Sequence, residues 1–198
     1  MQTRKRELLD ALIGYLVKHG LADLSLRPIA AEIGTSARLL IFHFRSKEQL
    51  LLEVLEEMQL RLQDSFTKLL AAKPGSRNVP LMRAFWDWAT EDENYRYHCL
   101  LYQLQILAAQ DPATYARFLK GNSMSWLKLV QPALPPSQQT QAFATLYGAV
   151  FDGLFIEFMS TGDRRRTTKA LEEFIQLARS HMQAAESAKP ARRPKRRT

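Results

Sequence analysis

The sequence predicts an all-α protein of about nine helices. Apolar residues recur at helical spacing along most of the 198 residues, and there is no convincing strand alternation or internal repeat. Clusters of helix-breaking residues separate the helical stretches, for example at positions 73–76 and 161–163. Hydrophobic residues make up 46% of the chain, so it can bury a substantial core and global disorder is not expected.

Three serines mark expected helix starts in the N-terminal quarter. The first helix spans about residues 3–19 and ends at Gly20, and Ser25, Ser36 and Ser46 are the expected N-caps of the next three helices. Ser46 and Gln49 also fit the capping-box pattern. Residues 25–44 thus hold two short helices joined by a turn containing glycine, which is the helix-turn-helix pattern. Its second helix is suited to the DNA major groove.

The remaining helices follow from the same periodicity. A long leucine-rich helix is expected at 47–72, and further helices at about 78–91, 94–110, 112–130, 137–160 and 164–186. We therefore divide the chain into a helix-turn-helix domain (1–46), a helical domain (47–187) and a disordered basic tail (188–198).

The basic excess lies at the two ends of the chain. The net charge is +8, made up of +3 in residues 1–50, −1 in residues 51–187 and +6 in residues 188–198. A densely negative partner would meet the N-terminal part. The tail is either a solvated charge run or a second contact with phosphates. The basic side chains of Arg4, Lys5 and Arg6 are equally consistent with an arm near DNA and with a solvated helix start.

The sequence lacks the signals that are typical of several other classes of protein. Cys99 is the only cysteine, so no intramolecular disulfide can form. No apolar run reaches the ~18 residues of a membrane span, and the N-terminus does not resemble a secretory signal. We expect a soluble, cytoplasmic protein. The four histidines show no metal-ligand spacing and no glycine-rich phosphate loop occurs, so we expect neither an enzyme nor a cofactor or metal.

Residues 4–58 resemble the N-terminal domain of TetR-family (tetracycline-repressor-like) regulators. The resemblance rests on the motifs at 25–30 (SLRPIA), 34–36 (GTS), 42–44 (FHF) and 46–50 (SKEQL), in that order and spacing. It implies a homodimeric DNA-binding transcriptional repressor that a small-molecule effector releases from its operator. The sequence departs from the family at Arg38, often a glycine, and at Ile41 and His43, often tyrosines that contact phosphate.

The helix-turn-helix supplies the expected DNA contacts. Arg27 and Lys47 are assigned to phosphates, and Arg38 to a bidentate contact with guanine O6 and N7. Leu39 either touches a thymine methyl or packs inside, while Leu40 and Phe44 are expected in the core. The full set of predicted contacts is Arg27, Thr35, Ser36, Ala37, Arg38, Leu39, Phe42, His43 and Lys47.

Mixed aromatic and polar residues in the helical domain allow a ligand pocket. The family resemblance points to a small apolar or aromatic effector there, although simple core packing explains most of these residues equally well. The predicted effector-binding residues are Trp86, Tyr95, Cys99, Tyr102, Gln103, Phe118, Trp126 and Phe155.

The segment 137–160 carries more apolar surface than one helix needs to dock on its own domain, with Gly148 and Gly153 among the aromatics. We favour a homodimer interface that matches two half-sites of a near-palindromic operator, over a central core helix. The predicted interface residues are Phe143, Tyr147, Val150, Phe151, Leu154, Phe158, Phe174 and Leu177.

Two other readings stay open. An effector-independent, nucleoid-type protein would coat DNA with the help of the basic tail. An all-helical enzyme or binding module would lack DNA affinity altogether.

Overall fold

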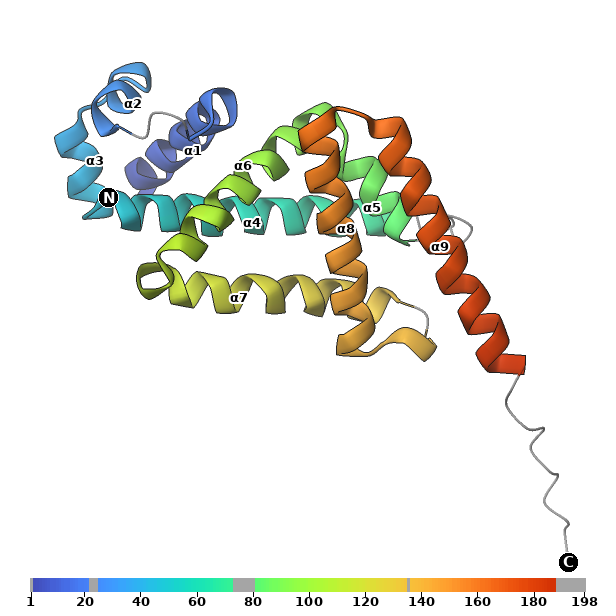
Figure 1. The fold of residues 1–198 in the computed structure, drawn as a ribbon. Coiled ribbons are helices and arrows are strands. Elements are labelled where there is room, and N and C mark those ends of the chain that lie inside the picture. Colours follow the sequence, from blue (N-terminus) through green and yellow to red (C-terminus); the bar gives the residue numbers. More distant parts are fainter. Residues whose placement is uncertain (1, 22–24, 73–80, 135, 188–198) are drawn as a thin grey trace, which may run out of the picture. The chain divides into compact units, whose positions relative to one another are not determined.

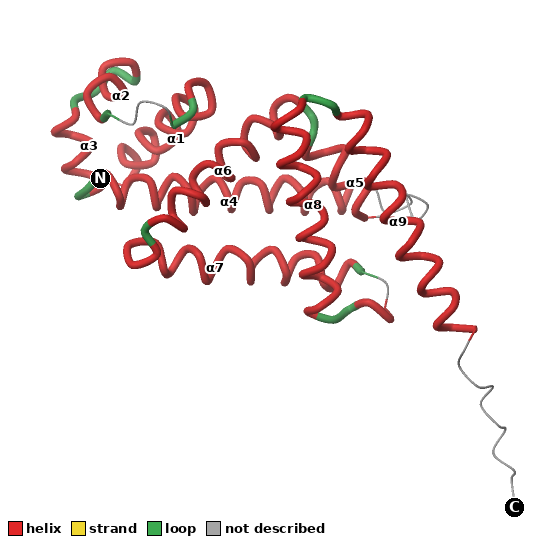
Figure 2. The backbone as a smooth tube through the Cα atoms, viewed as in Figure 1, coloured by secondary structure: helices red, strands yellow, loops and turns green. Residues whose placement is uncertain are grey.

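The computed structural model describes residues 2–21, 25–72, 81–134 and 136–187. Every regular element in these ranges is helical, which confirms the predicted fold class (Figure 2). The predicted disordered tail lies outside the described residues. The helices are α1 (Gln2–His19), α2 (Leu26–Glu32), α3 (Ala37–Phe44), α4 (Lys47–Ala72), α5 (Leu81–Ala89), α6 (Asp92–Gln110), α7 (Pro112–Val130), α8 (Gln141–Thr161) and α9 (Arg164–Ser187), with short 3-10 turns at Gln131–Ala133 and Pro136–Gln138.

The chain forms two compact units. Unit 1 consists of residues 1–77 and 87–130, and unit 2 of residues 78–86 and 131–198. Helix α5 passes from one unit to the other between Trp86 and Asp87. The helix-turn-helix therefore shares a compact unit with α4, α6 and α7, while α8 and α9 belong to the other unit.

In unit 1, α4 is the helix on which α1, α3, α6 and α7 pack. α1 and α3 contact its N-terminal half, α6 crosses it, and α7 runs alongside it (Figure 1). The apolar face of α1 and the inner face of α3 meet the leucine-rich face of α4. Fully buried residues at this junction are Leu12, Ile13, Leu16, Leu40, Phe44, Leu50, Val54, Leu55 and Met58. This core holds the helix-turn-helix on the start of α4.

In unit 2, α8 packs against α9 around an aromatic cluster. The Trp86 ring lies 6.0 Å from Phe151 and 6.4 Å from Phe155, and its indole N–H donates to the Thr168 hydroxyl at 2.8 Å. Gly162, with φ +68, ends α8 and turns the chain into α9. A positive φ is a conformation that glycine adopts without steric cost, so the turn suits this residue.

The observed helix starts differ from the predicted ones at two places. α6 begins at Asp92 rather than 94, and α8 begins at Gln141 rather than 137. Thr140 is the N-cap of α8, and its hydroxyl accepts from the Phe143 N–H at 3.2 Å. The expected start of the helix at 78–91 lies among residues 73–80, outside the described ranges.

Candidate nucleic-acid interface

The turn between α2 and α3 is fixed by backbone geometry and a helix cap. Gly34 adopts φ +69, and the Thr35 N–H donates to the Ala30 carbonyl at 2.8 Å. Ser36 is extended, and its hydroxyl accepts from the Leu39 N–H at 3.1 Å, as its predicted capping role requires. Ser25 occupies the N-cap position of α2, but its side chain makes no cap hydrogen bond.

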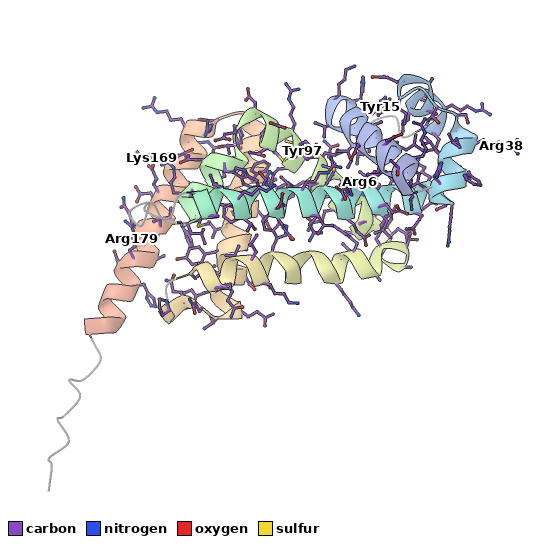
Figure 3. The ribbon with its side chains drawn as sticks, turned by 180° about the vertical axis from the view of Figure 1, so that it is seen from behind. Arg6, Tyr15, Arg38, Tyr97, Lys169 and Arg179 are labelled. Carbon is purple, nitrogen blue, oxygen red and sulfur yellow. The ribbon has the colours of Figure 1, made fainter. Side chains whose placement is uncertain are left out.

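Helix α3 has one buried face and one exposed face. Leu40 and Phe44, one turn apart, are fully buried, as predicted. The opposite face exposes Arg38, Ile41 and Phe42, and Phe42 is 68% exposed. Arg38 stands on the outer side of α3, away from α1 (Figure 3). This exposed face is what a helix needs to enter the major groove.

Two residues, Arg45 and Ser46, join α3 to α4, and the backbone of Arg45 is strained. Arg45 has φ 70 and ψ −49, and the Ser46 N–H donates across it to the Phe44 carbonyl at 2.9 Å. This is a γ-turn with positive φ, which is rare and strained for a residue with a side chain. Arg45 is exposed.

The predicted capping box at the start of α4 is only half formed. The Ser46 hydroxyl accepts from the Gln49 N–H at 3.1 Å, as expected. The Gln49 side chain instead donates to Glu53 at 3.4 Å, because the Ser46 N–H already bonds to Phe44.

The predicted DNA contacts occupy different environments. Arg27, Ser36, Arg38 and Phe42 are exposed, whereas Ala37, Leu39, His43 and Lys47 are half-buried. The Thr35 hydroxyl is buried and has no hydrogen-bond partner among the described residues, so it does not face a DNA backbone. Sequence reasoning left out Ile41 and Arg45. Their spacing of three and seven residues from Arg38 at a helical period would have placed both on this face.

The three basic residues at the start of α1 pair with carboxylates. Lys5 lies 2.7 Å from Glu53, and Arg6 lies 2.6 Å from Glu57, both on α4. The Arg4 side chain pairs with the nearby Glu7 at 2.9 Å. Lys5 and Arg6 are thus paired with α4, which neither a free arm for DNA nor a solvated helix start describes, whereas the exposed Arg4–Glu7 pair fits a solvated helix start.

The end of α1 is also tied to α2. Glu32 accepts from His19 Nε2 at 2.8 Å and from Lys18 Nζ at 3.1 Å. The His19 hydrogen bond, followed by that of Lys18, lowers the pKa of Glu32. The carboxylate thus stays charged and links the two helices.

The predicted effector residues divide between the two units. Trp86 and Phe155 belong to the aromatic cluster of unit 2, where both are buried. The others are in unit 1, where Phe118 is buried and Gln103 is exposed; the half-buried residues are Tyr95, Cys99, Tyr102 and Trp126.

Two of the unit 1 effector candidates contact each other. Tyr95 and Cys99 share a side-chain hydrogen bond, and burial, the larger effect, raises the pKa of Tyr95 to about 12. Burial also raises the pKa of the Cys99 thiol. Both groups are therefore neutral and suited to a polar contact inside an apolar site. Among the described residues, no cluster of three or more His, Cys, Asp or Glu could hold a metal ion.

One predicted interface residue belongs to the core of unit 2. Phe151 is buried between Phe85 at 4.5 Å and Phe155 at 5.7 Å, so it is not available at the surface of the chain. Leu177 is 69% exposed, so its place in an interface stays a prediction. The other predicted residues are half-buried: Phe143, Tyr147, Val150, Leu154, Phe158 and Phe174.

Helix α8 exposes an apolar face whose two large side chains were not among the predicted interface residues. Leu146 and Ile156 are each 48% exposed, and Ala149 and Gly153 lie exposed between them. By length and composition alone α8 is apolar enough to cross a membrane, contrary to expectation, and only 17% of its most apolar stretch is buried. This helix has more apolar surface than its own chain covers.

Comparisons with known proteins give one consistent result. Residues 8–54 match the sequence profile of bacterial regulatory proteins of the tetR family. The chain is 27% identical over 172 residues to the HTH-type transcriptional regulator BetI of Rhizobium meliloti, covering 77% of this chain and 76% of that protein. It is 26% identical over 159 residues to BetI of Agrobacterium fabrum, with coverage of 77% and 75%.

Solved structures share the fold. A transcriptional regulator from Rhodococcus sp. matches with a TM-score of 0.70 at 16% identity, covering 87% of this chain and 94% of that one. The multidrug binding protein EbrR complexed with ethidium matches with a TM-score of 0.62 at 21% identity, covering 86% and 96%. A regulator from Saccharomonospora viridis in complex with choline matches with a TM-score of 0.57 at 17% identity, covering 89% and 97%.

Proposed function

Because this chain belongs to the TetR family of bacterial transcriptional regulators, we propose that it is a cytoplasmic repressor that binds a near-palindromic operator as a homodimer and leaves it when a small effector binds. The observation that carries the proposal is the exposed face of α3. Leu40 and Phe44 anchor this helix in the core, which leaves Arg38 and its neighbours free to meet base edges.

We assign the proposed phosphate and base contacts to positively charged residues of the helix-turn-helix and the start of α4. Arg27 on α2 and Lys47 at the first position of α4 contact phosphates on either side of the groove. The N-terminal end of α4 adds its own positive dipole end near Lys47. Arg38 reads a guanine, because its guanidinium can donate to O6 and N7 together. Two copies of this set read the two halves of the operator.

The proposed effector is a small aromatic or apolar molecule, and an organic cation fits this class. The structural relatives are described with ethidium and with choline, both cations. The helical part of this chain is rich in aromatic rings, whose faces attract cations. Neutral polar groups such as Tyr95 and Cys99 would orient the molecule without adding charge.

The proposed dimer uses the exposed faces of α8 and α9. Leu146 and Ile156 on α8 and Leu177 on α9 are large apolar side chains left in water in the single chain. Small residues between them, Ala149 and Gly153, allow a second helix to approach closely. In a twofold dimer, this face would be covered by the same face of a second copy of the chain.

Selection of bound sequences from a random DNA pool tests the proposal. A short inverted repeat, bound by two protein chains in light scattering, is the expected result. Broad protection without a preferred sequence would identify a nucleoid-type protein instead, and no enrichment at all would exclude DNA binding. Release is tested on the selected site by fluorescence anisotropy with ethidium and choline as probes. Continued binding at saturating levels of both would contradict an organic cation of either kind as the effector.

A further inference from the structure

The exposed face of α3 combines two apolar side chains with two arginines. Ile41 is 38% and Phe42 is 68% exposed, and neither side chain carries a hydrogen-bonding group. Arg38 lies one turn before them, and Arg45 follows at the end of the helix. We call these four residues the reading stripe. At 100° per residue, Arg38, Ile41 and Phe42 lie within an arc of about 100° around the axis of α3, on one side of the helix.

Packing within the chain does not account for the two apolar members. The core side of α3 is already occupied by Leu40 and Phe44, which are fully buried. Phe42 contacts the ring of the adjacent His43 edge-on, with centroids 5.3 Å apart, and most of its surface stays in water. Burying an exposed ring of this size against a partner lowers the free energy of the complex.

The chemistry of the major groove limits what that partner can be. Base edges there present hydrogen-bond donors and acceptors, and the apolar group among them is the C5-methyl of thymine. Pressing Phe42 or Ile41 against a donor or acceptor would bury that group without a hydrogen bond, which is unfavourable. A thymine methyl is the base feature that an apolar pair can cover at no such cost.

We propose that Ile41 and Phe42 read thymine methyl groups next to the guanine read by Arg38. The proposal rests on the proposed DNA-binding function and names the bases that the reading stripe selects. Residues three and four positions after Arg38 lie roughly 4.5 to 6 Å further along the helix axis. With base pairs spaced about 3.4 Å apart, the thymines lie within about two base pairs of that guanine. The sequence analysis considered Leu39 for a thymine contact. The proposal assigns that contact to the exposed Ile41 and Phe42 instead.

The test replaces single thymines of the selected operator by deoxyuridine, which removes only the methyl group. Binding of the wild-type chain should weaken about fourfold at one or two positions per half-site, as one buried methyl group is worth about that factor. Phe42→Ala and Ile41→Ala should bind the thymine operator more weakly and lose the response to deoxyuridine at those positions. Leu60→Ala, at an exposed leucine of α4, is the matched control and should keep the full response.

Two results would overturn the proposal. One is wild-type binding that is indifferent to deoxyuridine at every thymine of the site. The other is an unchanged deoxyuridine response in both Phe42→Ala and Ile41→Ala, with thermal unfolding showing that the variants are folded. Failure to enrich any specific site in the earlier selection would instead overturn the proposed function, so the two failures are distinguishable.

Discussion

Arg6 on α1 donates two hydrogen bonds to Glu57 on α4, at 3.0 and 2.6 Å, between residues 51 positions apart in the chain. Glu57 is only 11% exposed and also accepts from Arg61 at 2.7 Å. Arg61 in turn pairs with Asp10 on α1. These four side chains clamp the first helix to the helix that carries the rest of unit 1.

Glu57→Gln should destabilise the protein by about 1–2 kcal/mol, because the amide keeps the size of the side chain but loses the charge-assisted hydrogen bonds from two arginines. Denaturant unfolding measures the loss. Glu7→Gln is the control, since its exposed pair with Arg4 should contribute less than about 0.5 kcal/mol. Equal losses in the two variants would show that the clamp is no stronger than a surface ion pair.

Arg38→Ala should weaken operator binding by about 1–3 kcal/mol and relax base preference at one position in each half-site. Sequences selected by the variant measure the preference directly. Arg27→Ala is the comparison, because loss of a phosphate contact should weaken binding to all sequences alike. An unchanged preference in Arg38→Ala would remove its assignment to guanine.

His98 should make the protein less stable in mild acid. It is buried against the Trp88 ring, and its Nδ1 lies 2.8 Å from the Asn94 carbonyl. Burial, only partly offset by that hydrogen bond, lowers the pKa of His98 to about 4 from its ordinary 6.5. The unfolded chain therefore binds the proton more readily, so stability is highest above pH 6.5 and falls as the pH drops toward 4.

The expected loss is about 3 kcal/mol, at 1.36 kcal/mol for each pH unit of the shift. The free energy of unfolding at pH 7 and pH 4 measures it, with His98→Gln as the reference because glutamine does not titrate. The wild-type loss should exceed the loss in the variant. Parallel pH profiles would show that other groups cause the acid sensitivity.

Ile156→Arg should convert the proposed dimer to monomers without unfolding the chain, because the arginine would be forced into an apolar interface on α8. Sedimentation gives the oligomeric state, and circular dichroism reports the helical content. Leu60→Arg changes an equally large exposed residue on α4 and should remain dimeric. A dimeric Ile156→Arg protein would place the interface elsewhere.

Local signals predicted the N-terminal helices well. Ser36 and Ser46 cap helices where expected because capping depends on residues three positions apart, which the sequence shows directly. The Arg6–Glu57 pair depends on how distant segments meet, and no local pattern reveals it. Phe151 was assigned to a surface because periodicity shows an apolar face but not which neighbour covers it, here Phe85 and Phe155.

The tight turn at Arg45 has a mechanical consequence. The Ser46 N–H bonds to Phe44, the last residue of α3, and Leu40 and Phe44 are buried where α3 packs on α4, so we expect α3 to move together with α4. α4 has 26 residues, so it is a lever about 39 Å long. A tilt of about 5° around its distant end would carry α3 sideways by about 3 Å, close to the height of one base pair.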